Sequence, residues 1–218
     1  MSDSAGSQKL LPLMAILAVV IYGVGDVVSG LLYTGYSFRD QAISELTAFG
    51  SPVRAFMMTI MLAHGGLLVI FGVCLFRSAC SRALRWTGAL VSAANLVTLP
   101  THTIWAMSSR GMQTGVNDTL HAQTTIAFSL LVGAAVALSA IAIRGWFRPF
   151  AFVALAVIIA FGVAASGAMT GITEDDTPWA GAYERINCYV YFLWLVVLAL
   201  LAPREFPPSC RETARETA

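Results

Sequence analysis

Six long apolar runs dominate the chain, and polar segments separate them. The runs cover residues 10–33, 55–76, 84–107, 119–143, 150–169 and 183–202. A helix needs about 20 residues to cross the hydrocarbon core of a bilayer, and every run reaches that length. The pattern predicts an all-α membrane protein, a bundle of six transmembrane helices over residues 10–202 with a structured first outer loop. Residues 1–9 and 203–218 are expected to be a polar N-terminus and a polar tail.

The composition supports a membrane protein and removes one class of partner. Of the 218 residues, 57% are hydrophobic and only 11% are charged, whereas soluble domains carry about 25% charged residues. The net charge is +1 and the chain has no block of Lys or Arg, so nucleic-acid binding is not expected. The first run is longer than the core of a signal peptide, and we expect it to remain as an uncleaved span.

The distribution of Lys and Arg predicts the orientation of the bundle, because basic residues in short loops stay on the cytoplasmic side. Nine of the 13 fall near the two termini and in the connections after the second and fourth runs, and four fall in or beside the other connections. We therefore expect a multi-pass protein of the cell membrane with both termini in the cytoplasm. The connections after the first, third and fifth runs then face outward.

Polar side chains within the runs recur at helical spacing and gather in the outer half. An ionisable side chain at membrane depth costs roughly 2.5–3.5 kcal/mol on insertion scales, so it persists where it faces a partner or water. We expect the polar stripes to face a shared polar and aromatic cavity. The predicted proton donors and acceptors are Asp26, Glu45, Asp118, His121 and Glu184. The predicted ligand-lining residues are Tyr22, Tyr33, His64, Asn95, His102, Trp105, Asn187, Tyr191 and Trp194.

Structural roles for the same residues remain open. Asp26 can form a hydrogen bond or an ion pair between helices, and the histidines can be hydrogen-bonded core residues. Asp118 and Glu184 each begin an apolar run, where a carboxylate stabilises the N-terminus of a helix.

The first outer segment, "YSFRDQAISELTAFGSP" at residues 36–52, is polar and lies between two apolar runs. In a structural interpretation it is a folded lid that Glu45 ties down. In a functional interpretation Glu45 and Asp40 lie over the mouth of the cavity, where partial burial raises the pKa of a carboxyl group and makes it a proton donor.

Three segments together resemble a known family. "YSFRDQAISELTAFGSPVR", "NDTLH" at a helix start and "AYERIN" at the start of the last helix resemble the domain-of-unknown-function 998 membrane proteins. The resemblance implies a six-helix membrane fold and no established general activity. It puts Asp118, His121, Glu184 and Asn187 at family-like positions. The "ISEL" element before Gly50 and Pro52 is also similar to the first outer loop of the Frag1/DRAM/Sfk1 families, some of which are linked to lipid-anchor remodelling.

Three functions are compatible with these residues, and we expect the first, with the other two as alternatives in the order given. The first is a membrane enzyme that isomerises or cyclises a lipid or isoprenoid, with buried acids as proton donors and aromatic rings beside a developing cation. The second is a small-molecule carrier, receptor or partner-binding subunit. The third is a zinc-dependent lipid hydrolase that uses His64, His102, His121 and Asp118. We expect no cofactor and no stoichiometric metal, and the expected partners are membrane lipids and a lipophilic small molecule.

Overall fold

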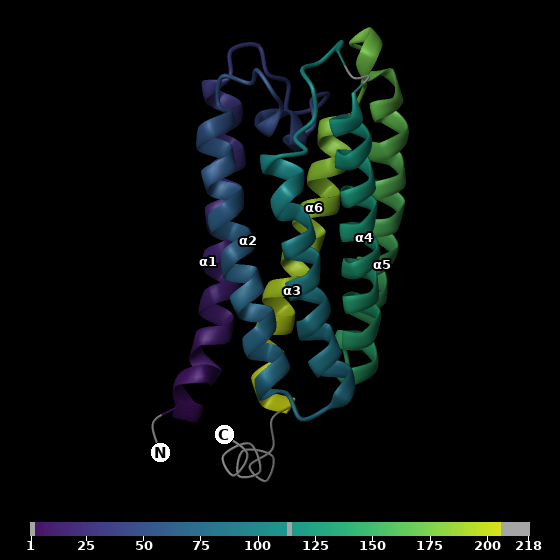
Figure 1. Cartoon of the computed structure of the whole chain (residues 1–218). Coiled ribbons are helices and arrows are strands. Elements are labelled where there is room, and N and C mark those ends of the chain that lie inside the picture. The colour runs from purple at the N-terminus through teal and green to yellow at the C-terminus, as the bar shows by residue number, and fades with distance from the viewer. Residues whose placement is uncertain (1–2, 113–114, 206–218) are drawn as a thin grey trace.

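The computed structural model describes residues 3–112 and 115–205, and these fold into helices joined by short connections (Figure 1). The long helices are α1 (Asp3–Leu32), α2 (Arg54–Ser78), α3 (Arg82–Thr103), α4 (Val116–Ala142), α5 (Phe147–Ala168) and α6 (Ala180–Leu201). The short 3-10 helices are η1 (Ile43–Thr47), η2 (Met169–Glu174) and η3 (Ala202–Glu205). The described ranges contain no strand. The all-α class and the six predicted helices are confirmed, while most of the predicted polar tail lies outside the described residues.

The six long helices run side by side along one axis (Figure 1). Each packs against its neighbour in sequence, and α6 also packs against α1. Residues 33–53, 104–112 and 169–179 connect helices at one end of the bundle, which we call the loop end. The short connections 79–81 and 143–146 lie at the opposite end, which we call the basic end because Arg77, Arg82, Arg85, Arg144 and Arg148 are located there.

Five helical segments are long and apolar enough to cross a membrane: Leu10–Leu32, Arg54–Ser78, Val116–Ala142, Phe147–Glu174 and Ala180–Leu201. α3 has a comparable length but is more polar. Four of its polar side chains are buried and find partners on α2, on α4 or in the preceding turn of α3: Thr87, Ser92, Asn95 and Thr101. Ser92 donates to the carbonyl of Val69 (2.8 Å) and Thr101 to the hydroxyl of Thr124 (2.7 Å). α3 is therefore polar because it faces protein.

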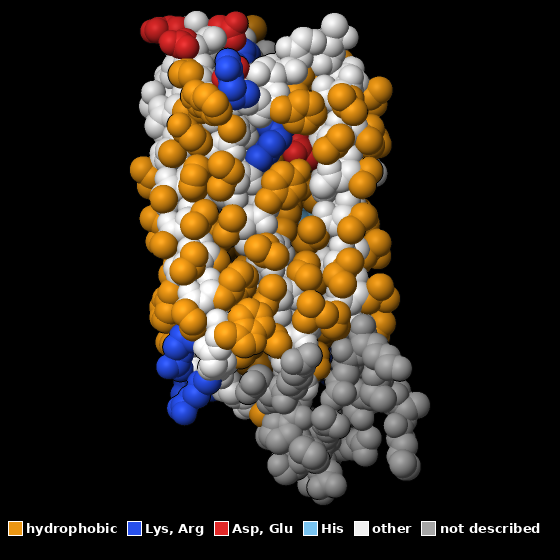
Figure 2. All heavy atoms as spheres, turned by 180° about the vertical axis from the view of Figure 1, so that it is seen from behind, with side chains coloured by type: hydrophobic (Ala, Val, Ile, Leu, Met, Phe, Trp, Pro, Cys, Tyr) orange, Lys and Arg blue, Asp and Glu red, His pale blue; other side chains and the backbone are white. Residues whose placement is uncertain are grey.

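The surface of the bundle is apolar along most of its length. Figure 2 shows hydrophobic side chains over the helices, with both acidic and basic side chains at and just below the loop end, and with Lys and Arg at the basic end. Leu31, Leu130 and Val163 are each at least 70% exposed. Soluble monomers rarely expose apolar patches larger than a few hundred Å². With its five apolar helices, this surface identifies the chain as a multi-pass membrane protein.

α2 and α3 pack most closely at a pair of glycines. A Cβ atom at Gly72 would lie 2.5 Å from the carbonyl oxygen of Gly88, and a Cβ atom at Gly88 would lie 2.5 Å from the carbonyl oxygen of Gly72. Small residues let membrane helices approach this closely, and packing then replaces the hydrophobic effect as the main attraction between them. The two glycines therefore set the distance between α2 and α3.

We predict that Gly72→Ala lowers the melting temperature of the purified protein, because its Cβ meets rigid backbone and the two helices must separate. The matched control is Gly66→Ala in the same helix, where an added Cβ has nothing within 4 Å. Gly66→Ala should leave the melting temperature unchanged or raise it, since alanine favours a helix by about 1 kcal/mol over glycine. Equal behaviour of the two variants would show that this contact does not hold the helices together.

Candidate functional site at the loop end

Residues 33–53 form a compact cap on the loop end. The Tyr36 hydroxyl lies 3.0 Å from the carbonyl oxygen of Gln41 and 2.8 Å from that of Ala42, which closes a turn ahead of η1. Ile43 and Leu46 of η1 are buried in the hydrophobic core. The polar segment is therefore held against the helices by apolar side chains as well as by its charges.

The start of α6 lies directly against this cap. The backbone N–H of Ala182 donates to the carbonyl of Arg39 (2.9 Å), and the backbone N–H of Ile43 donates to the Glu184 carboxylate. A Cβ atom at position 181 would lie 2.1 Å from the carbonyl oxygen of Gln41. Only glycine at this position leaves room for the cap to reach the first turn of α6.

Arg185 of α6 and Asp26 of α1 form a buried, bidentate ion pair. The Arg185 Nη2 and Nε atoms lie 2.7 and 3.0 Å from the two Asp26 carboxylate oxygens. Tyr189 donates a further hydrogen bond to Asp26 (2.7 Å). The remaining Arg185 donors reach the cap, at the carbonyl of Phe38 (2.8 Å) and the hydroxyl of Tyr36 (2.8 Å). One guanidinium group therefore joins α1, α6 and the cap.

Arg110 joins the cap to the other two loop-end connections. Its Nη2 and Nε atoms lie 2.7 and 2.9 Å from the carboxylate oxygens of Glu45, which is 4% exposed. Its Nη1 atom lies 3.0 Å from the carboxylate of Asp175. Glu45 also accepts the backbone N–H of Ala42 (2.9 Å). Glu45 thus ties the cap down, as the structural interpretation of the sequence proposed.

Asp40 makes a third connection, at the exposed rim. Its carboxylate accepts from Arg39 (2.8 Å) and from the backbone N–H of Trp179 (3.1 Å), and its carbonyl accepts from Thr177 (2.7 Å). The hydrogen bond from Arg39, followed by the one from Trp179, lowers the pKa of Asp40 to about 2. Asp40 is therefore a charged anchor at neutral pH, and it is unsuited to donate a proton.

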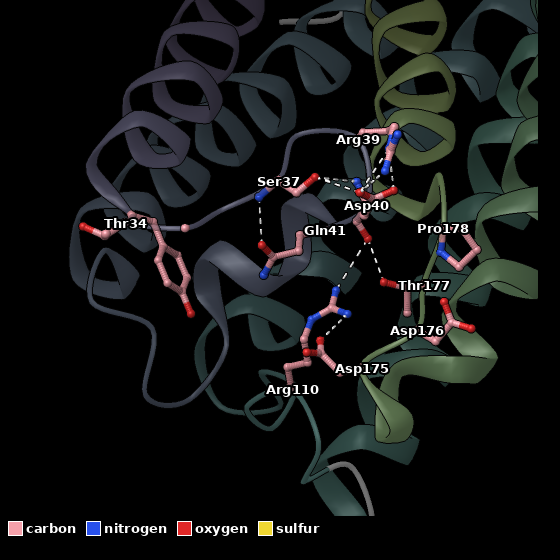
Figure 3. A pocket seen from close by; sticks show the side chains of 12 residues that line it. Thr34, Ser37, Arg39, Asp40, Gln41, Arg110, Asp175, Asp176, Thr177 and Pro178 are labelled. Carbon is pink, nitrogen blue, oxygen red and sulfur yellow. Dashed lines mark hydrogen bonds and ion pairs between the residues drawn. The ribbon is translucent and has the colours of Figure 1, made fainter.

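A cavity of about 520 Å³ opens between these three connections, beside the end of α1 (Figure 3). Its charged lining consists of Arg39, Arg110, Asp40, Asp175 and Asp176. Hydroxyl and amide groups complete it, from Tyr33, Thr34, Ser37, Gln41 and Thr177. The arginines are paired with Asp40, Asp175 and Glu45, whereas Asp176 forms no ion pair with any described residue. The cavity is therefore polar, and acids outnumber arginines around it.

Two predicted residues, Asp118 and His121, lie on the first turns of α4 and bond to the end of α3 and the connection that follows it. Asp118 opens α4 and accepts from the backbone N–H of Ser108 (2.7 Å), from the Ser108 hydroxyl (2.8 Å) and from the backbone N–H of Gly115 (3.1 Å). His121, one turn later, bonds to the carbonyls of Thr101 and Trp105, both at 3.2 Å. Its ring centroid lies 6.2 Å from that of His102. The hydrogen bond from the backbone N–H of Gly115 gives Asp118 the role of a carboxylate at the N-terminus of a helix.

Most of the remaining predicted residues lie deeper in the bundle, where Phe192 contacts the rings of Tyr22, His64 and Tyr191. His64 bonds to the carbonyl of Ala18 (2.9 Å), and its ring lies 4.9 Å from the ring of Tyr22. Tyr191 stacks on Trp194, whose Nε1 donates to Ser139 (3.1 Å). Asn95 donates to the carbonyl of Val91 and Asn187 to that of Ile158. Of the fourteen predicted site residues, only Tyr33 lines the loop-end cavity.

Among the described residues, the three histidines are not gathered into one cluster of possible metal ligands. No group of three or more His, Cys, Asp or Glu residues in the described part of the chain is arranged to hold a metal ion. His64 lies against Tyr22 and Phe192, whereas His102 and His121 lie near the cap. The arrangement gives no support to the zinc hydrolase interpretation.

Sequence reasoning missed Arg110 and Arg185, the two residues that organise the site. The sequence shows both only as basic residues in or beside the predicted outer connections. The distribution of acidic and basic residues could have indicated their role. Only four arginines fall in or beside the predicted outer connections, and seven Asp and Glu residues fall there. At membrane depth a charge needs a partner, so each of these arginines was a candidate partner for an acid.

A family model, described as "Protein of unknown function (DUF998)", matches residues 16–201. The chain belongs to the DUF998 family. Comparison with curated proteins finds no match, and comparison with solved structures finds none. The matched residues contain all six long helices in whole or in large part, and they contain the Arg185–Asp26 and Arg110–Glu45 pairs. The similarity of the cap to the Frag1/DRAM/Sfk1 families stays a prediction.

The buried pair of this DUF998 protein gives a test of its role. We predict that Asp26→Asn lowers stability by about 3–5 kcal/mol, because it leaves the Arg185 charge buried without a counter-charge. Thermal unfolding of the purified protein measures the loss. The control is Arg39→Gln at the exposed rim pair, which should shift the melting temperature little, since exposed pairs are screened by water. Comparable losses in both variants would contradict a special role for the buried pair.

Proposed function

We propose that this DUF998 protein is a membrane receptor or carrier that binds the amine-bearing headgroup of a phospholipid in the loop-end cavity. The observation that carries the proposal is the composition of the cavity, in which three aspartates face two arginines that are already paired. A surplus of negative charge in a partly enclosed site attracts a cation. An ammonium group can bind Asp175 and Asp176, and the nitrogens of Arg39 that Asp40 leaves unpaired can bind the adjoining phosphate.

The size and position of the cavity support a headgroup as the ligand. Its volume of about 520 Å³ lies in the range of small-molecule sites, roughly 300–1,000 Å³. Its lining is polar, whereas a site for a whole polyene or acyl chain would be mostly apolar. It opens beside Tyr33 and Thr34, where α1 leaves the apolar part of the bundle. A lipid there can keep its acyl chains against the exposed apolar face of α1.

An acid–base enzyme acting on a lipid or isoprenoid is the second candidate, and one residue favours it. Asp26 and Glu45 are paired with arginines, and Asp118 is held by several donors. Glu184, in contrast, forms no ion pair with a described residue, and its carboxylate accepts the backbone N–H of Ile43. A carboxyl group without a counter-charge is the better proton donor.

We also propose the topology that the site requires. All six long helices cross the membrane, α3 included, and both termini are cytoplasmic, which puts the loop end outside. α3 supports this because it runs the length of the bundle between α2 and α4 (Figure 1). The number of Lys and Arg residues favours the basic end as the cytoplasmic one.

Cysteine labelling in intact cells tests this topology. In a background without native cysteines, Ile104→Cys at the end of α3 should react with a membrane-impermeant reagent from outside. Arg82→Cys at the start of α3 and Arg144→Cys should react only after the membrane is opened. Labelling of both ends of α3 from one side would contradict six spans, and the reverse pattern would contradict the orientation.

Native mass spectrometry tests headgroup binding. We predict that the purified protein retains dioleoyl phosphatidylethanolamine over dioleoyl phosphatidylcholine, because the methylated choline group cannot donate hydrogen bonds to Asp175 and Asp176. The double variant Asp175→Asn/Asp176→Asn should reduce binding roughly 2- to 30-fold, since each exposed ion pair contributes about 0.2–1 kcal/mol. The control Glu174→Gln removes a neighbouring exposed acid that does not line the cavity. An equal loss in the control, or no preference for ethanolamine, would contradict the proposal.

The same samples decide the enzyme candidate. Products of phospholipids and polyprenyl lipids are sought by mass spectrometry with wild type and with Glu184→Gln. Loss of general acid catalysis typically lowers a rate about 10²- to 10⁴-fold. Turnover that falls by this factor in the folded variant would establish the enzyme, whereas headgroup binding without any product would leave the receptor or carrier.

A further inference from the structure

A second cavity lies at the basic end, where α2 ends and α3 begins. Its volume is about 370 Å³, and its lining includes Arg82 and Arg85 on the first turn of α3. Phe76 and Trp86 line it as well and are 42% and 52% exposed. Two cations and two exposed aromatic rings therefore share one hollow on the apolar surface.

Arg82 and Arg85 both have N–H groups that no described residue accepts. Neither forms an ion pair with a carboxylate that the structure describes. Arg85 donates its Nε to the carbonyl of Ala79 (2.8 Å), which fixes the guanidinium plane beside the connection between the helices. Its two terminal nitrogens have no hydrogen-bond partner among the described residues, and Arg82 is exposed. The positive charge of the cavity is thus uncompensated by the described part of the chain.

We propose that this cavity binds the phosphate headgroup of an anionic phospholipid from the surrounding bilayer. Guanidinium groups bind phosphate through two parallel hydrogen bonds. Aromatic side chains lie at the depth of the headgroups, where Phe76 and Trp86 can contact the upper acyl chains. Basic pockets between transmembrane helices are typical sites for such lipids. This site differs from the loop-end cavity in its position and in the sign of its charge.

Native mass spectrometry with lipids of identical acyl chains tests the site. Dioleoyl phosphatidylglycerol should bind in preference to dioleoyl phosphatidylcholine. Arg82→Gln should weaken phosphatidylglycerol binding about fivefold and Arg82→Gln/Arg85→Gln about 25-fold, since each basic residue near an anionic headgroup contributes roughly a factor of five. The Arg82 side chain makes no hydrogen bond with a described residue, so the single variant tests the site without disturbing the fold.

The matched control is Arg144→Gln/Arg148→Gln, at the other connection of the basic end. It removes the same charge, and Arg148 also donates its Nε to a carbonyl, that of Ala140 (2.9 Å). An equal loss in this control would overturn the site and leave a general attraction of the basic end. Inorganic phosphate at the lipid's concentration should not displace phosphatidylglycerol, and displacement would overturn the lipid as ligand. Neither loss depends on whether phosphatidylethanolamine binds at the loop end.

Discussion

The pairing of Arg185 with Asp26 is the constraint on which the loop end depends. A guanidinium group this close to the apolar part of a membrane protein is tolerated only when its charge and its donors are satisfied. Asp26 on α1 neutralises the charge, and the cap supplies the remaining acceptors at Phe38 and Tyr36. The cap thus supplies acceptors that the buried Arg185 guanidinium needs. This requirement explains why a polar segment of this length is folded against the bundle.

Arg110 and Arg39 form further ion pairs, and these lie progressively nearer the surface. The exposed fraction of the side chain rises from 12% for Arg185 to 18% for Arg110 and 63% for Arg39. Charge-assisted hydrogen bonds strengthen where water is excluded, so the inner pair is rigid and the outer pair is weak. A ligand competes most easily with the weakest pair. This gradient supports binding at the rim of the cavity, where Asp175 is 75% exposed, and argues against chemistry at the buried carboxylates.

The helices could be predicted from the sequence because long apolar runs favour helices of membrane-crossing length. The polar segment 36–52 also indicates an anchoring role for Glu45, beside a role as a proton donor. The sequence did predict a shared cavity, but which side chains line the loop-end cavity could not be predicted from it. Helical spacing shows that Asn95 and His102 lie on one face of α3, but it does not reveal the partner of that face. His102 comes to lie near His121, whereas Asn95 bonds within its own helix. The Arg185–Asp26 pair spans 159 positions, and no local pattern records such a contact.

The two cavities lie at opposite ends of one bundle and carry opposite charge, which links the proposals on ligands and topology. Anionic lipids and the retention of basic loops both favour the cytoplasmic leaflet. Arg82 and Arg85 would therefore meet their ligand in the leaflet that the proposed orientation assigns to the basic end. The acidic cavity would face the other leaflet, where fewer anionic headgroups repel its carboxylates. A bundle inserted the other way would present each cavity to the leaflet that suits it less, so the charges of the two sites are themselves an argument for the orientation.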